Sequence, residues 1–305
     1  MRVTLLGPQR RPTLDSVVAS LGPGGPFATI TAGWQERERD DGELSERLGR
    51  RDVNLSLYRR WLDVQERDPD FTAADRRLRG VLGEMQDIYL LRLDYAMRAV
   101  YAVQRRNGDD EIRDGALADA IASVRELDAA HLHQVSEASG EFYQAWQPHG
   151  RPVIAEHRDE VTRLLGDAAA LVLAGGHVGV LADVLHLFNV AAALRSPVIA
   201  WSAGAMALTD RIVLFNDRAP QGPGHPEVYG SGLSLLRNLV LLPHARARML
   251  LDDTARMAVF ARRFAPARCI LLETGTRIET DGDGGCPPDA RVLAEDGRVT
   301  SLEAA

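Results

Sequence analysis

A continuous apolar stretch, Ala168–Ala174, limits the folds open to this chain more than any other feature of its sequence. A strand without polar alternation must be covered on both faces, which is typical of a parallel sheet between layers of helices. Shorter apolar runs occur at Val3–Leu6, Ala28–Ala32 and Pro197–Ala200, and helical patterns separate them. We therefore predict an α/β fold with a mostly parallel central sheet and helices on both faces.

Turn residues and apolar runs predict further elements of this fold. Strands are predicted at Val53–Leu57, Arg211–Phe215, Leu239–Leu242 and Cys269–Leu272. A helix over 13–21 should close at Gly22-Pro23, and a loop rich in Gly and Pro covers 216–232. Because ligands bind at the carboxyl ends of strands in such sheets, we expect the functional site at that edge.

A long helical segment interrupts the α/β pattern over 72–146. Apolar residues recur there at steps of three and four, first over 78–103 and again over 117–142, with turn residues at 107–110 between the two series. The pattern predicts an antiparallel helical hairpin, each helix about 40–50 Å long, inserted into a single α/β domain of residues 1–305. We expect this hairpin to serve as a lid or, more readily, as an interface in a homodimer or higher homo-oligomer.

Composition excludes several classes of function. The chain has 305 residues and a net charge of −7, so no nucleic-acid partner is expected. All 36 basic residues are Arg, which excludes chemistry that needs a lysine, including Schiff bases and P-loop nucleotide binding. Cys269 and Cys286 make neither a disulfide framework nor a zinc site, and His131 and His133 point to different faces of a helix. We expect no metal, no cofactor, no membrane segment and a cytoplasmic location.

Residues around Ser202 form the most informative motif of the chain. A buried strand ends at Trp201, and the small residues from Ala203 onward favour a helix. A strand that runs directly into a helix makes a sharp turn, which exposes one side chain and requires small residues such as Gly204 beside it. This pattern fits a nucleophile elbow with Ser202 as the nucleophile, although a serine in such a turn is more often a cap of the helix.

Other polar residues follow predicted strands at the same edge of the sheet. Gly175-Gly176 follows the strand over 168–174, where its N–H groups can approach an oxyanion. Gln35 and Glu36 follow the second strand, either to contact a substrate or as a solvated helix start. His244 follows the strand at 239–242, where a general base would stand, but a structural histidine is also common there.

Three motifs of this sequence together resemble a known family. They are Ala-Trp-Ser202-Ala-Gly-Ala, Leu-Pro-His244-Ala-Arg and Leu-Leu-Glu273-Thr-Gly-Thr, in this order. They look like the serine peptidases of the aspartyl dipeptidase (peptidase E) and cyanophycinase type, whose fold is akin to class I glutamine amidotransferases. The resemblance covers residues 1–60 and 150–280, without the hairpin. It implies a fold of that kind and a serine at the elbow.

The resemblance also implies roles for individual residues. Ser202 would attack a carbonyl, His244 would transfer its proton, and Glu273 would orient the imidazole. The N–H groups of Gly176 and Ala203 would form the oxyanion hole. An α/β-hydrolase order, with Asp210 or Asp217 as the acid, remains formally open, but too few strands precede the elbow. A glutamine amidotransferase is not expected, because the elbow has no cysteine.

The implied substrate is a small peptide cleaved next to an aspartyl residue. Arg246 and Arg248, just after His244, are candidates to bind its carboxylate, and Trp201 would narrow the site. The alternative is a non-catalytic relative that acts as a binding or scaffold protein through the hairpin. Trp201 would then plug the former site, which also departs from the family at Ala200, where a glycine is usual.

Overall fold

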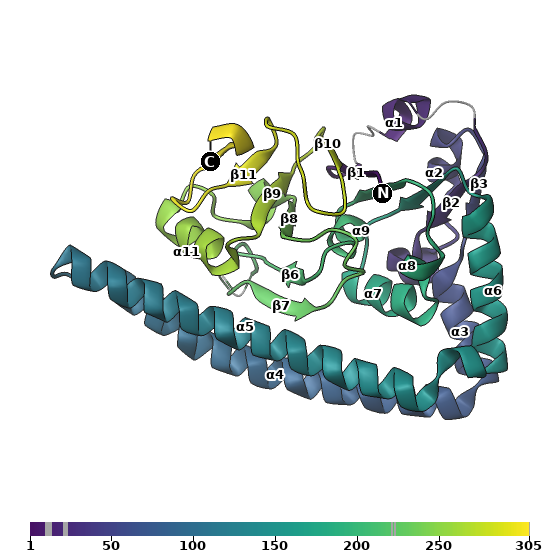
Figure 1. The fold of residues 1–305 in the computed structure, drawn as a ribbon, viewed down its shortest axis with the longest axis horizontal. Coiled ribbons are helices and arrows are strands. Elements are labelled where there is room, and N and C mark those ends of the chain that lie inside the picture. The colour runs from purple at the N-terminus through teal and green to yellow at the C-terminus, as the bar shows by residue number, and fades with distance from the viewer. Residues whose placement is uncertain (10–13, 21–23, 221, 223, 305) are drawn as a thin grey trace.

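The computed structural model describes residues 1–9, 14–20, 24–220, 222 and 224–304. Over these residues the chain forms an α/β body and a long helical hairpin that runs along one side of it (Figure 1). The predicted α/β class, with a mostly parallel sheet and the hairpin, is confirmed. The helix predicted over 13–21 is seen as α1 (Leu14–Ser20), and its predicted end at Gly22-Pro23 lies outside the described residues.

A six-stranded sheet, in the order β10-β1-β5-β4-β2-β3, forms the larger part of the body. Its strands are β1 (Val3–Leu6), β2 (Phe27–Ile30), β3 (Asp52–Asn54), β4 (Ala170–Leu173), β5 (Val198–Trp201) and β10 (Arg277–Thr280). All neighbouring strands are parallel except β10, which pairs antiparallel with β1. Every residue of β1, β2, β4 and β5 is buried, as expected for strands covered on both faces.

Helices cover both faces of this sheet because alternate side chains of each strand point to opposite sides. On one face Leu171, Leu173 and Ala200 share a core with α3, α6, α7, α8 and α9. On the other face Val172 and Ile199 share a core with α1 and α2. The helices that line these cores, besides α1, are α2 (Gly42–Arg47), α3 (Leu57–Arg67), α6 (Pro152–Asp167), α7 (Val178–Leu187), α8 (Val190–Ala193) and α9 (Ala203–Met206).

A second sheet, in the order β12-β11-β9-β8, extends the body (Figure 1). Its strands are β8 (Leu239–Pro243), β9 (Arg268–Leu272), β11 (Arg291–Leu293) and β12 (Val299–Ser301), of which β8 and β9 are parallel. One face, with Leu241 and Ile270, joins the core of the first sheet. The other face, with Leu242 and Leu271, packs with α11 (Thr254–Phe264) and the hairpin. The short helix α10 (Ala245–Arg248) follows β8.

Two local predictions are wrong. The loop predicted over 216–232 contains β7 (Glu227–Gly230), which pairs antiparallel with β6 (Ile212–Leu214). The strand predicted over Val53–Leu57 ends at Asn54, and α3 begins at Leu57. The start of α3 is stabilised by the buried carboxylate of Glu38, which accepts hydrogen bonds from the N–H groups of Tyr58 and Arg59, both at 2.9 Å. Glu38 is about 20 residues away in sequence, so no local pattern could reveal this cap.

The hairpin consists of α4 (Pro69–Gln104) and α5 (Asp110–Trp146). With 36 and 37 residues, each helix is about 54 Å long, slightly longer than predicted. Figure 1 shows the two helices side by side below the body, with their tip projecting beyond α11. Among the described residues, no helix is both long and apolar enough to cross a membrane. The described part of the chain also contains the 3₁₀ turns η1 (Ala32–Arg37), η2 (Pro148–Gly150) and η3 (Leu302–Ala304).

Candidate active site

Ser202 lies in the sharp turn between β5 and α9. Its backbone has φ 51° and ψ −126°, a conformation that costs a residue with a side chain about 1–3 kcal/mol. Ser202 is the residue before the first turn of α9, but its side chain makes no capping hydrogen bond to that helix. Ser202 is half-buried, and its hydroxyl does not cap the helix, which was the alternative interpretation of this motif.

The neighbours of Ser202 are small because the turn leaves no room for side chains. A Cβ atom on Gly204 would lie 2.5 Å from the carbonyl oxygens of both Leu173 and Ala174. A Cβ atom on Gly175 would lie 2.8 Å from the Cβ of Ser202. The end of β4 and the elbow after β5 are thus in direct contact.

The two glycines after β4 also contact the loop after β2. Gly176 has φ 125°, and a Cβ atom there would lie 2.3 Å from the carbonyl oxygen of Gly33. The N–H of His177 donates to the same oxygen at 2.8 Å, and the His177 ring accepts from the N–H of Val180 and caps α7. Gly176 and Ala203, the predicted oxyanion donors, therefore belong to adjoining turns at one edge of the sheet. A helix of this kind leaves its first N–H groups, including that of Ala203, without intrahelical partners.

His244 and Glu273 follow the adjacent parallel strands β8 and β9. The strands pair Pro243 with Leu272, and the N–H of His244 donates to the carbonyl oxygen of Leu272 at 3.2 Å. His244 is half-buried and has a left-handed backbone, with φ 58°. The Glu273 carboxylate accepts a hydrogen bond from the N–H of Arg246 at 2.8 Å, so it stabilises the start of α10.

Gly7 connects these two strand ends to the elbow. It follows β1, whose last residue, Leu6, is paired with Trp201 of β5. A Cβ atom on Gly7 would lie only 1.7 Å from the carbonyl oxygen of Glu273, and the Gly7 N–H donates to the carbonyl oxygen of Thr276 at 2.9 Å. In addition, α9 packs against β8. The carboxyl ends of both sheets therefore meet, and the turns that carry Gly176, Ser202, His244 and Glu273 lie along one edge.

The loop after β2 holds Gln35 and Glu36 in well-defined positions. Gln35 has φ 57° and ψ −122°, nearly the conformation of Ser202. The exposed carboxylate of Glu36 accepts a hydrogen bond from the hydroxyl of Tyr58 at 2.9 Å, and hydrogen bonds from its own N–H and from Tyr58 lower its pKa. Sequence reasoning missed Glu38, which is 1% exposed and whose pKa is raised by burial.

Two cavities border these strand ends. One, of about 680 Å³, is lined by Glu273 and Thr276 together with Arg218, Arg246, Arg291 and Arg298. The other, of about 370 Å³, is lined by Gln9, Trp34 and Trp201. Trp201 is buried on the sheet face that α1 and α2 cover, so its indole contributes to that core as well as to the cavity wall. Arg248 is exposed and is not among the residues lining the Arg-rich cavity.

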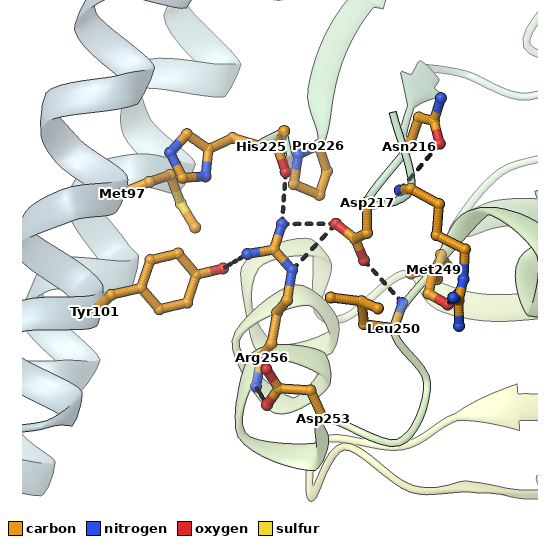
Figure 2. A network of polar contacts seen from close by, with 12 residues as sticks. Met97, Tyr101, Asn216, Asp217, His225, Pro226, Met249, Leu250, Asp253 and Arg256 are labelled. Carbon is orange, nitrogen blue, oxygen red and sulfur yellow. Dashed lines mark hydrogen bonds and ion pairs between the residues drawn. The ribbon is translucent and has the colours of Figure 1, made fainter. Parts of the chain in front are cut away.

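Asp217, a formal alternative for the catalytic acid, belongs to a network that fastens the hairpin to the body. Figure 2 shows Arg256 of α11 between the Asp217 carboxylate and the hydroxyl of Tyr101 on α4. Arg256 Nη2 donates to Asp217 at 2.6 Å, and the other Asp217 oxygen accepts from the N–H of Leu250 at 3.1 Å. Asp217 is therefore fully engaged in holding α11 and the adjoining loop.

Two further networks fasten the hairpin nearer its base. Arg263 of α11 is 3% exposed and donates at 2.7 Å to each oxygen of Asp128 on α5, and at 3.1 Å to the hydroxyl of Tyr89 on α4. Arg79 of α4 donates to Asp183 of α7, whose pKa is raised by burial. Because ion pairs and hydrogen bonds join the hairpin to the body at several points along its length, a hairpin fixed to the body is favoured over a lid that opens.

The two histidines of α5 have separate surroundings. His131 is buried, its ring stacks on that of Tyr89 with centroids 4.1 Å apart, and burial lowers its pKa. Its Nε2 lies 2.8 Å from the side-chain oxygen of Gln86. His133 is exposed. Among the described residues, no group of three or more His, Cys, Asp or Glu side chains could hold a metal ion.

Comparisons with known proteins give limited matches. No family model matches the chain. A 3-amino-4-hydroxybenzoate 4-O-methyltransferase from Streptomyces cremeus is 31% identical over 136 residues, which cover 41% of this chain and 36% of that protein. The chain thus matches little more than a third of the length of this curated relative. The crystal structure of a peptidase from an acI-B1 Actinobacterium aligns with 96% of this chain and 87% of its own, at 14% identity and a TM-score of 0.43.

Proposed function

We propose that this chain is a serine peptidase with Ser202 as its nucleophile, His244 as its general base and Glu273 as the residue that orients His244. The observation that carries the proposal is the strained backbone of Ser202 at a strand-to-helix turn, where its hydroxyl does not cap the helix. Strain at a residue with a side chain persists only where the surrounding structure imposes it, and such residues cluster at functional sites. A nucleophile elbow requires this geometry.

The proposed reaction is acyl transfer. Ser202 Oγ attacks the carbonyl carbon of the peptide bond while His244 takes its proton, and the N–H groups of Gly176 and Ala203 stabilise the oxyanion that forms. His244 then gives the proton to the leaving amine, and the C–N bond breaks to leave an acyl-enzyme. A water molecule, activated by His244, hydrolyses the ester and regenerates Ser202.

We further propose that the substrate is a small peptide with an aspartyl residue next to the cleaved bond. Four arginines line the cavity beside Glu273, against two acidic residues, Asp252 and Glu273. Such a cavity favours a carboxylate, which an arginine can bind through two parallel hydrogen bonds. Of the two arginines that the sequence suggested for carboxylate binding, Arg246 lines this cavity and Arg248 does not.

Labelling with a serine-reactive phosphonate tests the nucleophile. Intact-mass analysis should show one added phosphonyl group on the wild-type protein, mapped to the peptide that contains Ser202. Ser202→Ala should abolish the label and lower peptidase activity by at least about 10⁴-fold, whereas Ser234→Ala, at an exposed serine, should change neither. No labelling of a folded wild-type protein would contradict the proposal and favour the alternative, a scaffold protein in which Glu273 serves only to stabilise α10.

Substrate preference tests the role of Arg246. With aspartyl dipeptides, Arg246→Ala should raise KM about tenfold, equivalent to about 1.4 kcal/mol, because a carboxylate contact is lost. The backbone N–H that bonds Glu273 remains in this variant, so kcat should change little. Arg248→Ala serves as the matched control. If Arg246→Ala raised the KM for asparaginyl dipeptides as much as the KM for aspartyl dipeptides, carboxylate recognition by Arg246 would be contradicted.

A further inference from the structure

The outer side of α4 carries an exposed apolar stripe. Val81, Ile88, Leu91 and Tyr95 are 46%, 53%, 60% and 67% exposed, and the half-buried Met85 lies between the first two. Their spacing of seven residues, with intermediate members three or four apart, places them along one line of the helix over about 21 Å. We call Val81, Met85, Ile88, Leu91 and Tyr95 the α4 stripe.

The α4 stripe cannot be covered by the rest of this chain in the described arrangement. The inward side of α4, with Tyr89, Leu93 and Val100, is already buried against α5 and the body. The networks around Arg79, Arg256 and Arg263 hold α4 in that orientation. Soluble proteins rarely leave a contiguous row of large apolar side chains in water unless another surface covers it.

The order of residues along the α4 stripe is symmetric about Ile88. Val81 and Tyr95 each lie seven positions from Ile88, and Met85 and Leu91 each lie three. If two α4 helices cross antiparallel at Ile88, every apolar member of one stripe comes level with an apolar member of the other. A twofold axis makes such a contact self-complementary, since residue i of one copy meets residue j of the other and the reverse.

The charges beside the stripe also select the antiparallel arrangement. Glu84 and Arg92, both exposed, lie four positions before and four after Ile88. Antiparallel pairing at Ile88 brings the Glu84 of each copy level with the Arg92 of the other, at both ends of the contact. Parallel pairing would bring like charges level instead, which is unfavourable.

We propose that the α4 stripe is the interface of a homodimer in which two copies of this chain pack antiparallel about a twofold axis at Ile88. The interface is separate from the strand ends that carry Ser202, so the dimer does not depend on the proposed peptidase activity. Five apolar side chains per copy make a small contact, and we expect a dimer that dissociates on dilution.

Sedimentation of the full chain from about 1 to about 100 µM tests the dimer. The wild-type protein should pass from monomer to dimer over this range, and Ile88→Glu, which brings two carboxylates together on the axis, should remain monomeric. Ile112→Glu is the matched control, because Ile112 is 74% exposed on α5 and lies outside the stripe. Circular dichroism should show that both variants are folded. A wild-type protein that stays monomeric, or an Ile88→Glu variant that still dimerises, would overturn the proposal.

Disulfide cross-linking tests the direction of packing. Ile88→Cys should form a symmetric disulfide-linked dimer, because this residue lies on the axis. Tyr95→Cys alone should not, since its two copies would be about 21 Å apart, but a mixture of Val81→Cys and Tyr95→Cys proteins should cross-link. Efficient cross-linking of Tyr95→Cys to itself would indicate parallel helices and overturn the proposed axis. The wild-type protein, with Cys269 buried and Cys286 half-buried, is the control.

Discussion

Ser202 and Gln35 share an uncommon backbone conformation in the segments that follow two strands of the same sheet, β5 and β2. Their φ and ψ values are 51° and −126° for Ser202, and 57° and −122° for Gln35. Glycine adopts such values without cost, whereas other residues are strained by about 1–3 kcal/mol. At Ser202 the strain follows from the elbow, because β5 turns directly into α9 against Gly175.

Replacing Ser202 by glycine and by alanine should therefore reverse the usual order of stability. At ordinary helix or strand positions, glycine is about 0.5–1 kcal/mol less stabilising than alanine. We expect Ser202→Gly to have the higher free energy of unfolding here, by about 1 kcal/mol, because it relieves the positive φ. Urea denaturation measures the difference. If Ser202→Ala is the more stable variant, the backbone at Ser202 is not strained and the elbow geometry is in doubt.

At the scale of elements, Asp68 joins the start of the hairpin to the helix that follows it. Its carboxylate accepts from the N–H of Phe71, which caps α4, and forms two hydrogen bonds with the Arg151 guanidinium just before α6. The bonds from Arg151 are the main reason that the pKa of Asp68 is lowered. Asp68 thereby fixes both ends of the inserted segment at one point of the body.

The stability conferred by Asp68 should depend on pH. A carboxylate whose pKa is lower in the folded than in the unfolded protein stabilises the fold above its unfolded pKa, and this contribution is lost as pH falls through the folded pKa. Asp68→Asn keeps the cap but loses the ion pair, so it should cost about 1–3 kcal/mol at pH 7. The cost should shrink below about pH 4. Denaturation of the wild-type and Asp68→Asn proteins at pH 7 and pH 3 measures this loss of unfolding free energy, and Asp70→Asn, at an exposed residue, is the control. A loss that is the same at both pH values would argue against the ion pair.

For the whole molecule, the hairpin and the body are one assembly because buried charges join them. Arg263 of α11 and Asp128 of α5 are 3% and 5% exposed, and Tyr89 completes the network from α4, the other helix of the hairpin. Removing one partner of such a pair leaves an uncompensated buried charge, which typically costs about 3–5 kcal/mol, whereas replacing both partners by apolar residues can cost far less.

A double-mutant cycle tests this attachment. Arg263→Met and Asp128→Leu should each lower the free energy of unfolding by about 3–5 kcal/mol, and the double variant should lose at least about 2 kcal/mol less than the sum. The exposed ion pair of Arg163 and Asp167 on α6 provides the control, because such a pair contributes less than about 1 kcal/mol to the free energy of unfolding. Simple additivity for the buried pair would mean that these charges do not act together, and that the hairpin is held in another way.

Several features of this protein follow from its sequence alone, because they depend on residues close together in the chain. The apolar run over 168–174, the small residues after Ser202 and the periodicity of the hairpin predict a buried strand, a tight turn and two long helices. Each is a matter of steric and hydrophobic patterning within a few turns or strand residues. The α/β class follows from the same local patterns.

Only the tertiary structure decided which distant residues meet. The separation of a four-stranded sheet from the six-stranded one depends on which strands pair. The start of α3 at the carboxylate of Glu38 and the attachment of the hairpin through Arg256 and Arg263 depend on contacts across 20 to 174 positions of sequence. The choice between nucleophile-like turn and helix cap at Ser202 also needed the backbone angles, because both begin with the same residues. Short-range sequence patterns specify helices and strands. The free energy of burying a charged side chain, or of holding a turn in a strained conformation, depends on the residues that pack around it, and these are distant in sequence.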